Sequence, residues 1–152
     1  GHITVYLPSF DQACLEKAFK SLPNQEFHWF LSEVTSKYRE GNITYHPVNQ
    51  IDFNESLINC HGIITGGGFE TPAEALFLRK KILSIPILNH YEQECNAAAL
   101  KKMGVPVVYE VGDNFESIIE NWLRSDSPMP LIEANNINET LQYLFDTYNQ
   151  PI

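Results

Sequence analysis

The chain has 152 residues, a length typical of a single domain that can bury a core. Its composition is 43% hydrophobic and 12% aromatic, which excludes a disordered or low-complexity polypeptide. The formal net charge is −9 without a long run of Lys or Arg, so we expect no nucleic acid as a partner. The sequence has no transmembrane segment, and its three widely spaced cysteines suit the reducing cytoplasm.

Short apolar strands alternate with helical stripes along the chain. We interpret Gly1-His2 as a tag remnant and 3–152 as one domain. The patterns predict strands over 3–7, 26–31, 43–46, 62–65, 82–87 and 106–111. They predict helices over 10–22, 53–60, 71–78, 91–103, 115–123 and 137–148, with a linker over 125–135. Asn89 is the expected N-cap of the fourth helix, and Gly104 is its expected stop signal.

Six alternations of strand and helix predict an α/β fold with a doubly wound, parallel, six-stranded sheet of Rossmann type, in the order 3-2-1-4-5-6. A dinucleotide-binding domain carries G-x-G-x-x-G after its first strand, but here that turn reads Leu7-Pro8-Ser9-Phe10. The glycines follow the fourth strand instead. Because the first and fourth strands flank the switch point, both loops should open on one crevice, which favours a nucleotide other than NAD or FAD.

The stretch Gly62–Glu74, GIITGGGFETPAE, joins an apolar strand to a helix through three glycines. Thr71-Pro72-Ala73-Glu74 has the pattern of a capping box with proline at the first helical position. Free backbone N–H groups and the helix dipole at this point would form a phosphate cradle. The alternative is that the glycines only make a tight turn.

Three acidic or amide side chains near this crevice each allow two interpretations. Glu74 either completes the capping box or accepts hydrogen bonds from two ribose hydroxyls. Glu92 and Gln93 either compensate a helix dipole or bind sugar hydroxyls. None of the histidines has the spacing of a metal ligand, so we expect no metal site.

The stretch GIITGGGFETPAEALFLRKKILSIPILNHYEQECNAAALKKMGVPVV resembles the C-terminal, donor-binding domain of GT-B glycosyltransferases. It is most similar to the family 1 and family 28 group, which holds the MurG-like and UDP-glycosyltransferase-like enzymes. The resemblance rests on four elements: Gly67-Gly68, Thr71-Pro72-Ala73-Glu74, Ile85-Pro86 and Gln93-Glu94-Cys95-Asn96-Ala97. The order of strands and helices extends the resemblance to nearly the whole chain.

The resemblance implies a role for each position that matches a family motif. The residues that correspond to the family's diphosphate loop are Gly67, Gly68, Phe69, Glu70 and Thr71. Ser9 corresponds to a small polar residue near the phosphates. Glu74 corresponds to the glutamate that binds the ribose hydroxyls. Glu92 and Gln93 correspond to the pair that reads the donor sugar, and Val48 corresponds to the segment beside the uracil. Gly66 replaces a histidine of the plant-type enzymes, and Arg79 and Lys81 replace a usual Gly and Pro.

The resemblance also implies the function: the donor-binding domain of a glycosyltransferase that transfers a sugar from a UDP-sugar to an unknown acceptor, with inversion and without a metal or other cofactor. No catalytic residue is expected within the chain. The general base and the acceptor site would belong to a missing N-terminal domain or partner subunit, so these residues alone should be inactive. The full-length protein should be cytoplasmic, with a peripheral position at a membrane left open.

Two alternatives remain at this point. One is a stand-alone nucleotide-sugar-binding subunit of a split transferase. The other is a nucleotide-sugar epimerase-like domain, which would need its own acid and base in the crevice, where only Glu70 and Glu92 are available.

Overall fold

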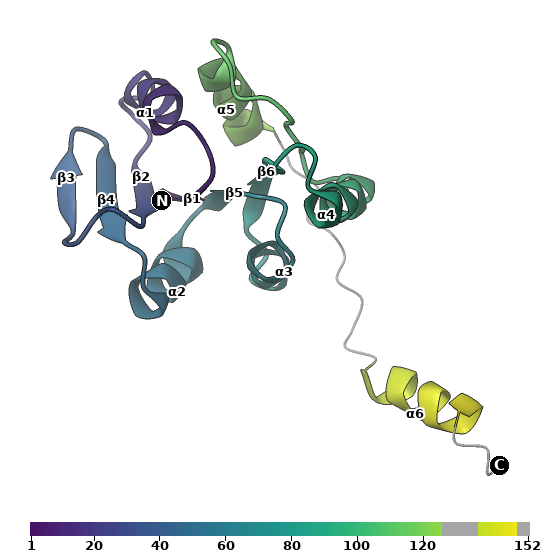
Figure 1. Ribbon diagram of the computed structural model, residues 1–152. Coiled ribbons are helices and arrows are strands. Elements are labelled where there is room, and N and C mark those ends of the chain that lie inside the picture. The colour runs from purple at the N-terminus through teal and green to yellow at the C-terminus, as the bar shows by residue number, and fades with distance from the viewer. Residues whose placement is uncertain (126–136, 149–152) are drawn as a thin grey trace.

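The computed structural model describes residues 1–125 and 137–148, and its centre is a six-stranded sheet in the order β3-β4-β2-β1-β5-β6 (Figure 1). The strands are β1 (Ile3–Tyr6), β2 (Phe27–Leu31), β3 (Tyr38–Glu40), β4 (Ile43–Pro47), β5 (Gly62–Thr65) and β6 (Lys81–Ser84). The helices are α1 (Gln12–Lys20), α2 (Gln50–Asn59), α3 (Glu70–Phe77), α4 (Tyr91–Lys102), α5 (Phe115–Arg124) and α6 (Ile137–Tyr148).

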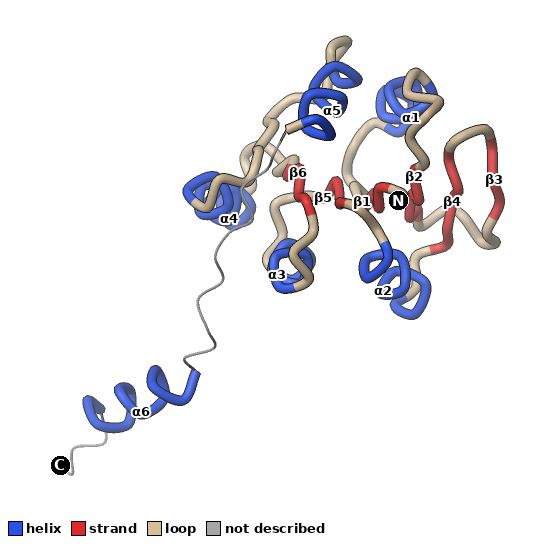
Figure 2. The backbone as a smooth tube through the Cα atoms, turned by 180° about the vertical axis from the view of Figure 1, so that it is seen from behind, coloured by secondary structure: helices blue, strands red, loops and turns tan. Residues whose placement is uncertain are grey.

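Helices cover both faces of the sheet. α1 and α5 lie on one face, α2 and α3 on the other, and α4 lies beside the β6 edge (Figures 1 and 2). β4, β2, β1, β5 and β6 pair in parallel, so the predicted doubly wound α/β fold is confirmed, and so is the order of the first five predicted strands. β1 and β5 are neighbours in this order, and the strand order reverses between them, which makes this position the topological switch point of the sheet.

The core lies on both sides of this sheet because its strands present apolar side chains to both faces. On the α1 and α5 side, Ile3, Val5 and Leu7 pack with residues of both helices in one buried cluster. On the other side, Ile63 and Ile82 pack with residues of α2, α3 and α4, among them Leu57, Ala75 and Leu100.

The two sheet edges differ from the prediction. The polar segment Tyr38–Glu40 forms an antiparallel strand against β4, through a two-residue turn in which Gly41 has φ 59. The predicted parallel strand over 106–111 is wrong, since only Val107 forms a bridge, with Ser84. Pro86 and Pro106 carry no N–H group, so the pairing between residues 81–86 and 106–111 cannot extend beyond this single bridge.

Two predicted helix caps are also wrong. α3 begins at Glu70 after Phe69, which makes no side-chain cap, so Thr71 is the second helical residue and the capping box does not form. α4 follows His90 as its N-cap. Asn89 lies one residue earlier with φ 62, and its N–H donates to Glu94 Oε1 at 2.9 Å.

The predicted C-terminal helix is present as α6, and Gly104 ends α4 with φ 83, as expected. The predicted linker over 125–135 lies, beyond Ser125, outside the described residues. None of the described helices combines the length and the apolar character that a membrane span requires.

Candidate functional site

The loops that follow β1 and β5 open on one hollow of about 150 Å³ at the carboxyl edge of the sheet. This arrangement confirms that both loops face one crevice. The first loop contributes Tyr6, Leu7, Pro8, Ser9 and Phe10; the second contributes Thr65, Gly66, Gly68, Thr71 and Pro72; and Ile87 and Gln93 complete the lining. The sequence did not predict Tyr6, Phe10 and Ile87 as lining residues, because each lies in a segment predicted as a strand or a helix.

The start of α3 supplies a row of unused donors to this hollow. The backbone N–H groups of Gly68, Phe69, Glu70 and Thr71 have no acceptor among the described residues. The next residue, Pro72, has no N–H group, and the positive end of the helix dipole lies here. Since the lining contains no Lys or Arg, backbone donors alone would attract an anion to this point.

Gly67 has a different role from its neighbours, because its N–H group is already used. It donates to Gln93 Oε1 at 3.1 Å, and the same oxygen accepts the Ile87 N–H at 3.0 Å. Gly67 is buried and does not line the hollow, whereas Gly68 is exposed and lines it. Gln93 therefore shapes the crevice by joining the two loops, and only its amide nitrogen is left to face a ligand.

The structure brings four of the predicted site residues together in the hollow and leaves the others outside it. Those in the lining are Ser9, Gly68, Thr71 and Gln93. Phe69, Glu70 and Glu92 are exposed at the starts of α3 and α4. Each is the sequence neighbour of a residue that lines the hollow. Val48 is 47% exposed in the loop between β4 and α2.

Glu74 lies away from the hollow. It is exposed on α3 and lines a separate, mainly apolar groove of about 420 Å³ between α2 and α3, together with Asn54, Ile58 and Phe77. A nucleoside that contacted Glu74 would thus have to extend from the glycine turn over α3.

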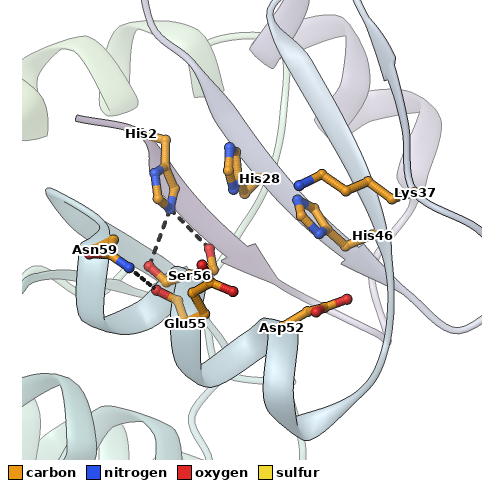
Figure 3. A pocket seen from close by; sticks show the side chains of 8 residues that line it. All are labelled: His2, His28, Lys37, His46, Asp52, Glu55, Ser56 and Asn59. Carbon is orange, nitrogen blue, oxygen red and sulfur yellow. Dashed lines mark hydrogen bonds between the residues drawn. The ribbon is translucent and has the colours of Figure 1, made fainter.

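A second hollow, of about 200 Å³, lies between α2 and the sheet and is lined by polar side chains (Figure 3). His2 immediately precedes β1, His28 is on β2 and His46 is on β4. Their rings lie side by side, with centroids 3.8 Å apart for His2 and His28 and 4.8 Å apart for His28 and His46. His2 Nε2 lies 2.9 Å from Ser56 Oγ on α2. The side chain assigned to a tag remnant is thus part of the packing between β1 and α2.

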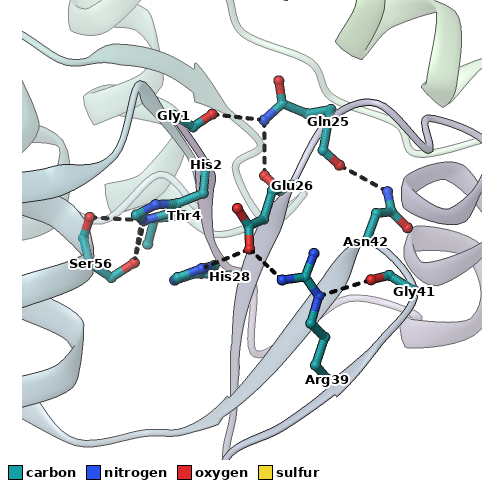
Figure 4. Close-up of polar contacts among 10 residues, drawn as sticks. All are labelled: Gly1, His2, Thr4, Gln25, Glu26, His28, Arg39, Gly41, Asn42 and Ser56. Atoms are coloured by element: carbon teal, nitrogen blue, oxygen red, sulfur yellow. Dashed lines mark hydrogen bonds and ion pairs between the residues drawn. The ribbon is translucent and has the colours of Figure 1, made fainter.

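Burial disfavours the charged form of these three histidines. Burial lowers the pKa of His28 to about 4 and that of His46 to about 4, and it lowers the pKa of His2 as well. Glu26 lies 3.7 Å from His28 and shares its carboxylate with Arg39 at 3.2 Å (Figure 4), which only partly offsets the burial. No group of three His, Cys, Asp or Glu among the described residues is placed to hold a metal ion.

A family model described as Glycosyl transferase family 1 matches residues 1–125. No curated protein sequence matches. Among solved structures, Spinosyn Forosaminyltransferase SpnP is similar with a TM-score of 0.64 and 16% identity, over 95% of this chain and 43% of that one.

The glycosyltransferase SnogD from Streptomyces nogalater is similar with a TM-score of 0.53 and 22% identity, over 85% of this chain and 39% of that one. The chain thus spans less than half of each of these proteins. At this identity the similarity shows the fold, which is half of a GT-B glycosyltransferase.

Proposed function

The chain belongs to glycosyl transferase family 1, and on that basis we propose that it is the donor-binding domain of an enzyme that transfers a sugar from a UDP-sugar. The observation that carries this proposal is the set of unused backbone N–H groups at Gly68, Phe69, Glu70 and Thr71, beside the hollow between β1 and β5. Donors of this kind suit the two phosphates of a nucleoside diphosphate.

The diphosphate would lie at the start of α3, with Ser9 on the opposite wall of the hollow. The nucleoside would extend over α3, so that its ribose meets Glu74 and its base lies near the backbone of Val48. The sugar would face the start of α4, where Glu92 is exposed and the amide nitrogen of Gln93 remains available. Glu70 would contribute its N–H group, since its carboxylate repels phosphate.

In this proposal the domain assists catalysis by stabilising the leaving group. Negative charge develops on the diphosphate as the bond to the sugar breaks, and the fixed N–H groups and dipole at the start of α3 stabilise that charge. The acceptor and the general base that removes its proton would come from a second domain or subunit, and transfer would proceed with inversion and without a metal. These residues alone should therefore bind donor without transferring sugar.

Isothermal titration calorimetry with UDP tests this proposal. A Cβ at Gly68 would have no heavy atom within 4 Å, so Gly68→Ala should fold normally and yet narrow the space in front of the phosphate donors. We expect Gly68→Ala to weaken UDP binding about tenfold, the loss of roughly one charge-assisted hydrogen bond. Gly112→Ala is the matched control, since its Cβ would meet only Asn114 Oδ1 at 3.9 Å. Equal UDP affinity for both variants and the wild type would contradict the proposal.

The sugar assignment has its own test. Glu92→Ala should change the relative affinities for a series of UDP-sugars and leave UDP nearly unchanged. Gln93→Ala should weaken UDP itself as well, because Gln93 also holds Gly67 and Ile87. A Glu92→Ala variant that binds every UDP-sugar as the wild type does would remove Glu92 from the site.

A further inference from the structure

Both polar backbone groups of Gly67 are bound by side chains of α4. Gln93 Oε1 accepts the Gly67 N–H at 3.1 Å, and Asn96 Nδ2 donates to the Gly67 carbonyl at 3.1 Å. Because Gln93 and Asn96 are three residues apart on one helix, they lie on the same side of it and can reach the same residue. The motif that carries the family resemblance includes Asn96, but Asn96 does not line the hollow.

The glycine turn also packs directly on the start of α4. A Cβ added at Gly67 would lie 2.8 Å from the Gln93 carbonyl oxygen, 2.9 Å from Gln93 Cβ and 3.0 Å from Pro86 Cβ. Real Cβ atoms do not approach other atoms this closely, so only glycine fits here. The close approach leaves the turn little freedom to shift against α4 as long as both side-chain hydrogen bonds hold.

From these contacts we propose that Asn96 is a positioning residue for the anion site. With Gln93 it fixes Gly67, and Gly67 in turn directs the N–H groups of Gly68–Thr71 toward the hollow. Gln93 Oε1 also holds Ile87, so the turn after β5 and the loop after β6 form one unit. The inference rests on the proposed function in one respect, namely that the anion at this turn is the diphosphate of UDP.

The test compares Asn96→Asp, Asn96→Ala and the wild type across pH. A carboxylate at position 96 cannot donate to the Gly67 carbonyl, but a protonated carboxyl group can. Relative to the wild type at the same pH, Asn96→Asp should bind UDP about tenfold more weakly at pH 8 and recover as the pH falls toward 5. Asn96→Ala should stay weak throughout. Asn121→Asp, at an exposed position on α5, is the matched control and should bind as the wild type does.

Hydrogen exchange of the Gly67 amide, followed by NMR without ligand, gives an independent readout. Its protection should fall several-fold in Asn96→Asp at pH 8 and remain at the wild-type level in Asn121→Asp. If the wild type does not bind UDP, the proposed function fails, while the exchange rates still decide the role of Asn96. Wild-type exchange at Gly67 together with wild-type UDP affinity in Asn96→Asp at pH 8 would overturn the inference.

Discussion

Glu74 is a residue for which a structural and a functional role can now be separated. The capping interpretation is wrong, because α3 begins at Glu70 and Phe69 makes no side-chain cap. The Glu74 side chain is exposed and makes no hydrogen bond to a described residue. Its carboxylate is therefore available to a ligand.

We therefore expect Glu74→Ala to change the free energy of unfolding by less than about 0.5 kcal/mol, as for an exposed helical position. UDP affinity should fall, because a bidentate acceptor of the two ribose hydroxyls is lost, while affinity for inorganic pyrophosphate should not. Thermal unfolding and calorimetry on the same samples measure both effects. A variant that loses stability and keeps its UDP affinity would contradict the ribose assignment.

The sequence could predict Ser9, Gly68, Thr71 and Gln93 as lining residues, because strand order alone places their loops at one crevice. It could not predict that the Gly67 N–H group is already bound to Gln93. That contact depends on how closely α4 approaches the glycine turn, and no local pattern reports such a distance. Asn96 was visible in the motif, but its role required the same tertiary contact.

At the scale of elements, the end of α3 contains a strained residue. Arg79 has φ 55 and lies in a Schellman motif, with Arg79 N–H donating to Leu76 O at 3.0 Å and Lys80 N–H to Ala75 O at 2.8 Å. α4 ends in the same way, with Gly104 at the equivalent position. The left-handed conformation is free of strain for Gly104 but not for Arg79.

Arg79→Gly should accordingly raise the free energy of unfolding by about 1 kcal/mol, since the relief of strain exceeds the added entropy of the unfolded chain. Gly104→Ala is the reciprocal variant and should lower it by a similar amount. Chemical denaturation measures both changes. Destabilisation by Arg79→Gly would show that the Arg79 side chain makes a contribution larger than the strain.

The histidine stack under α2 predicts how stability depends on pH. Burial lowers the pKa of His28 and that of His46 to about 4, below the unfolded value of 6.5. Lys37 also lowers both pKa values, whereas Glu26 raises that of His28 and Asp52 raises that of His46. Between pH 6.5 and 4 the unfolded chain binds more protons than the folded one, so stability is full above pH 6.5 and is lost as the pH falls.

Denaturation at a series of pH values checks this expectation. His28→Gln should reduce the slope of stability against pH between 6.5 and 4, because one titrating group is removed from the folded core. His90→Gln changes an exposed histidine outside the stack and serves as the control. Wild-type stability that does not fall over this interval would show that the imidazoles can accept protons in the folded state.

For the molecule as a whole, the sequence predicted the doubly wound sheet because the alternation of strands and helices leaves few other topologies. The errors lie at the edges. β3 is polar and exposed, so nothing in its composition distinguishes it from a loop, while 106–111 is apolar and resembles a buried strand. Pairing at a sheet edge depends on which backbone groups have a partner, and apolar patterns do not contain that information.

The net charge of the chain is −9, and no Lys or Arg lines the hollow, so the proposed binding of an anion there cannot depend on a basic side chain. Attraction has to come from backbone N–H groups and a helix dipole, whose effect falls off within the first turn. A nucleoside diphosphate should therefore bind only where those groups point, and not at a diffuse basic surface.

Chemical-shift mapping with UDP on uniformly ¹⁵N-labelled protein tests the central claim most directly. The account predicts that the largest shifts fall on the amides of Gly68–Thr71, with smaller ones at Ser9 and at the Gln93 side-chain amide, all on one saturable curve. Shifts confined to the hollow under α2, or to any face away from the glycine turn, would contradict the account.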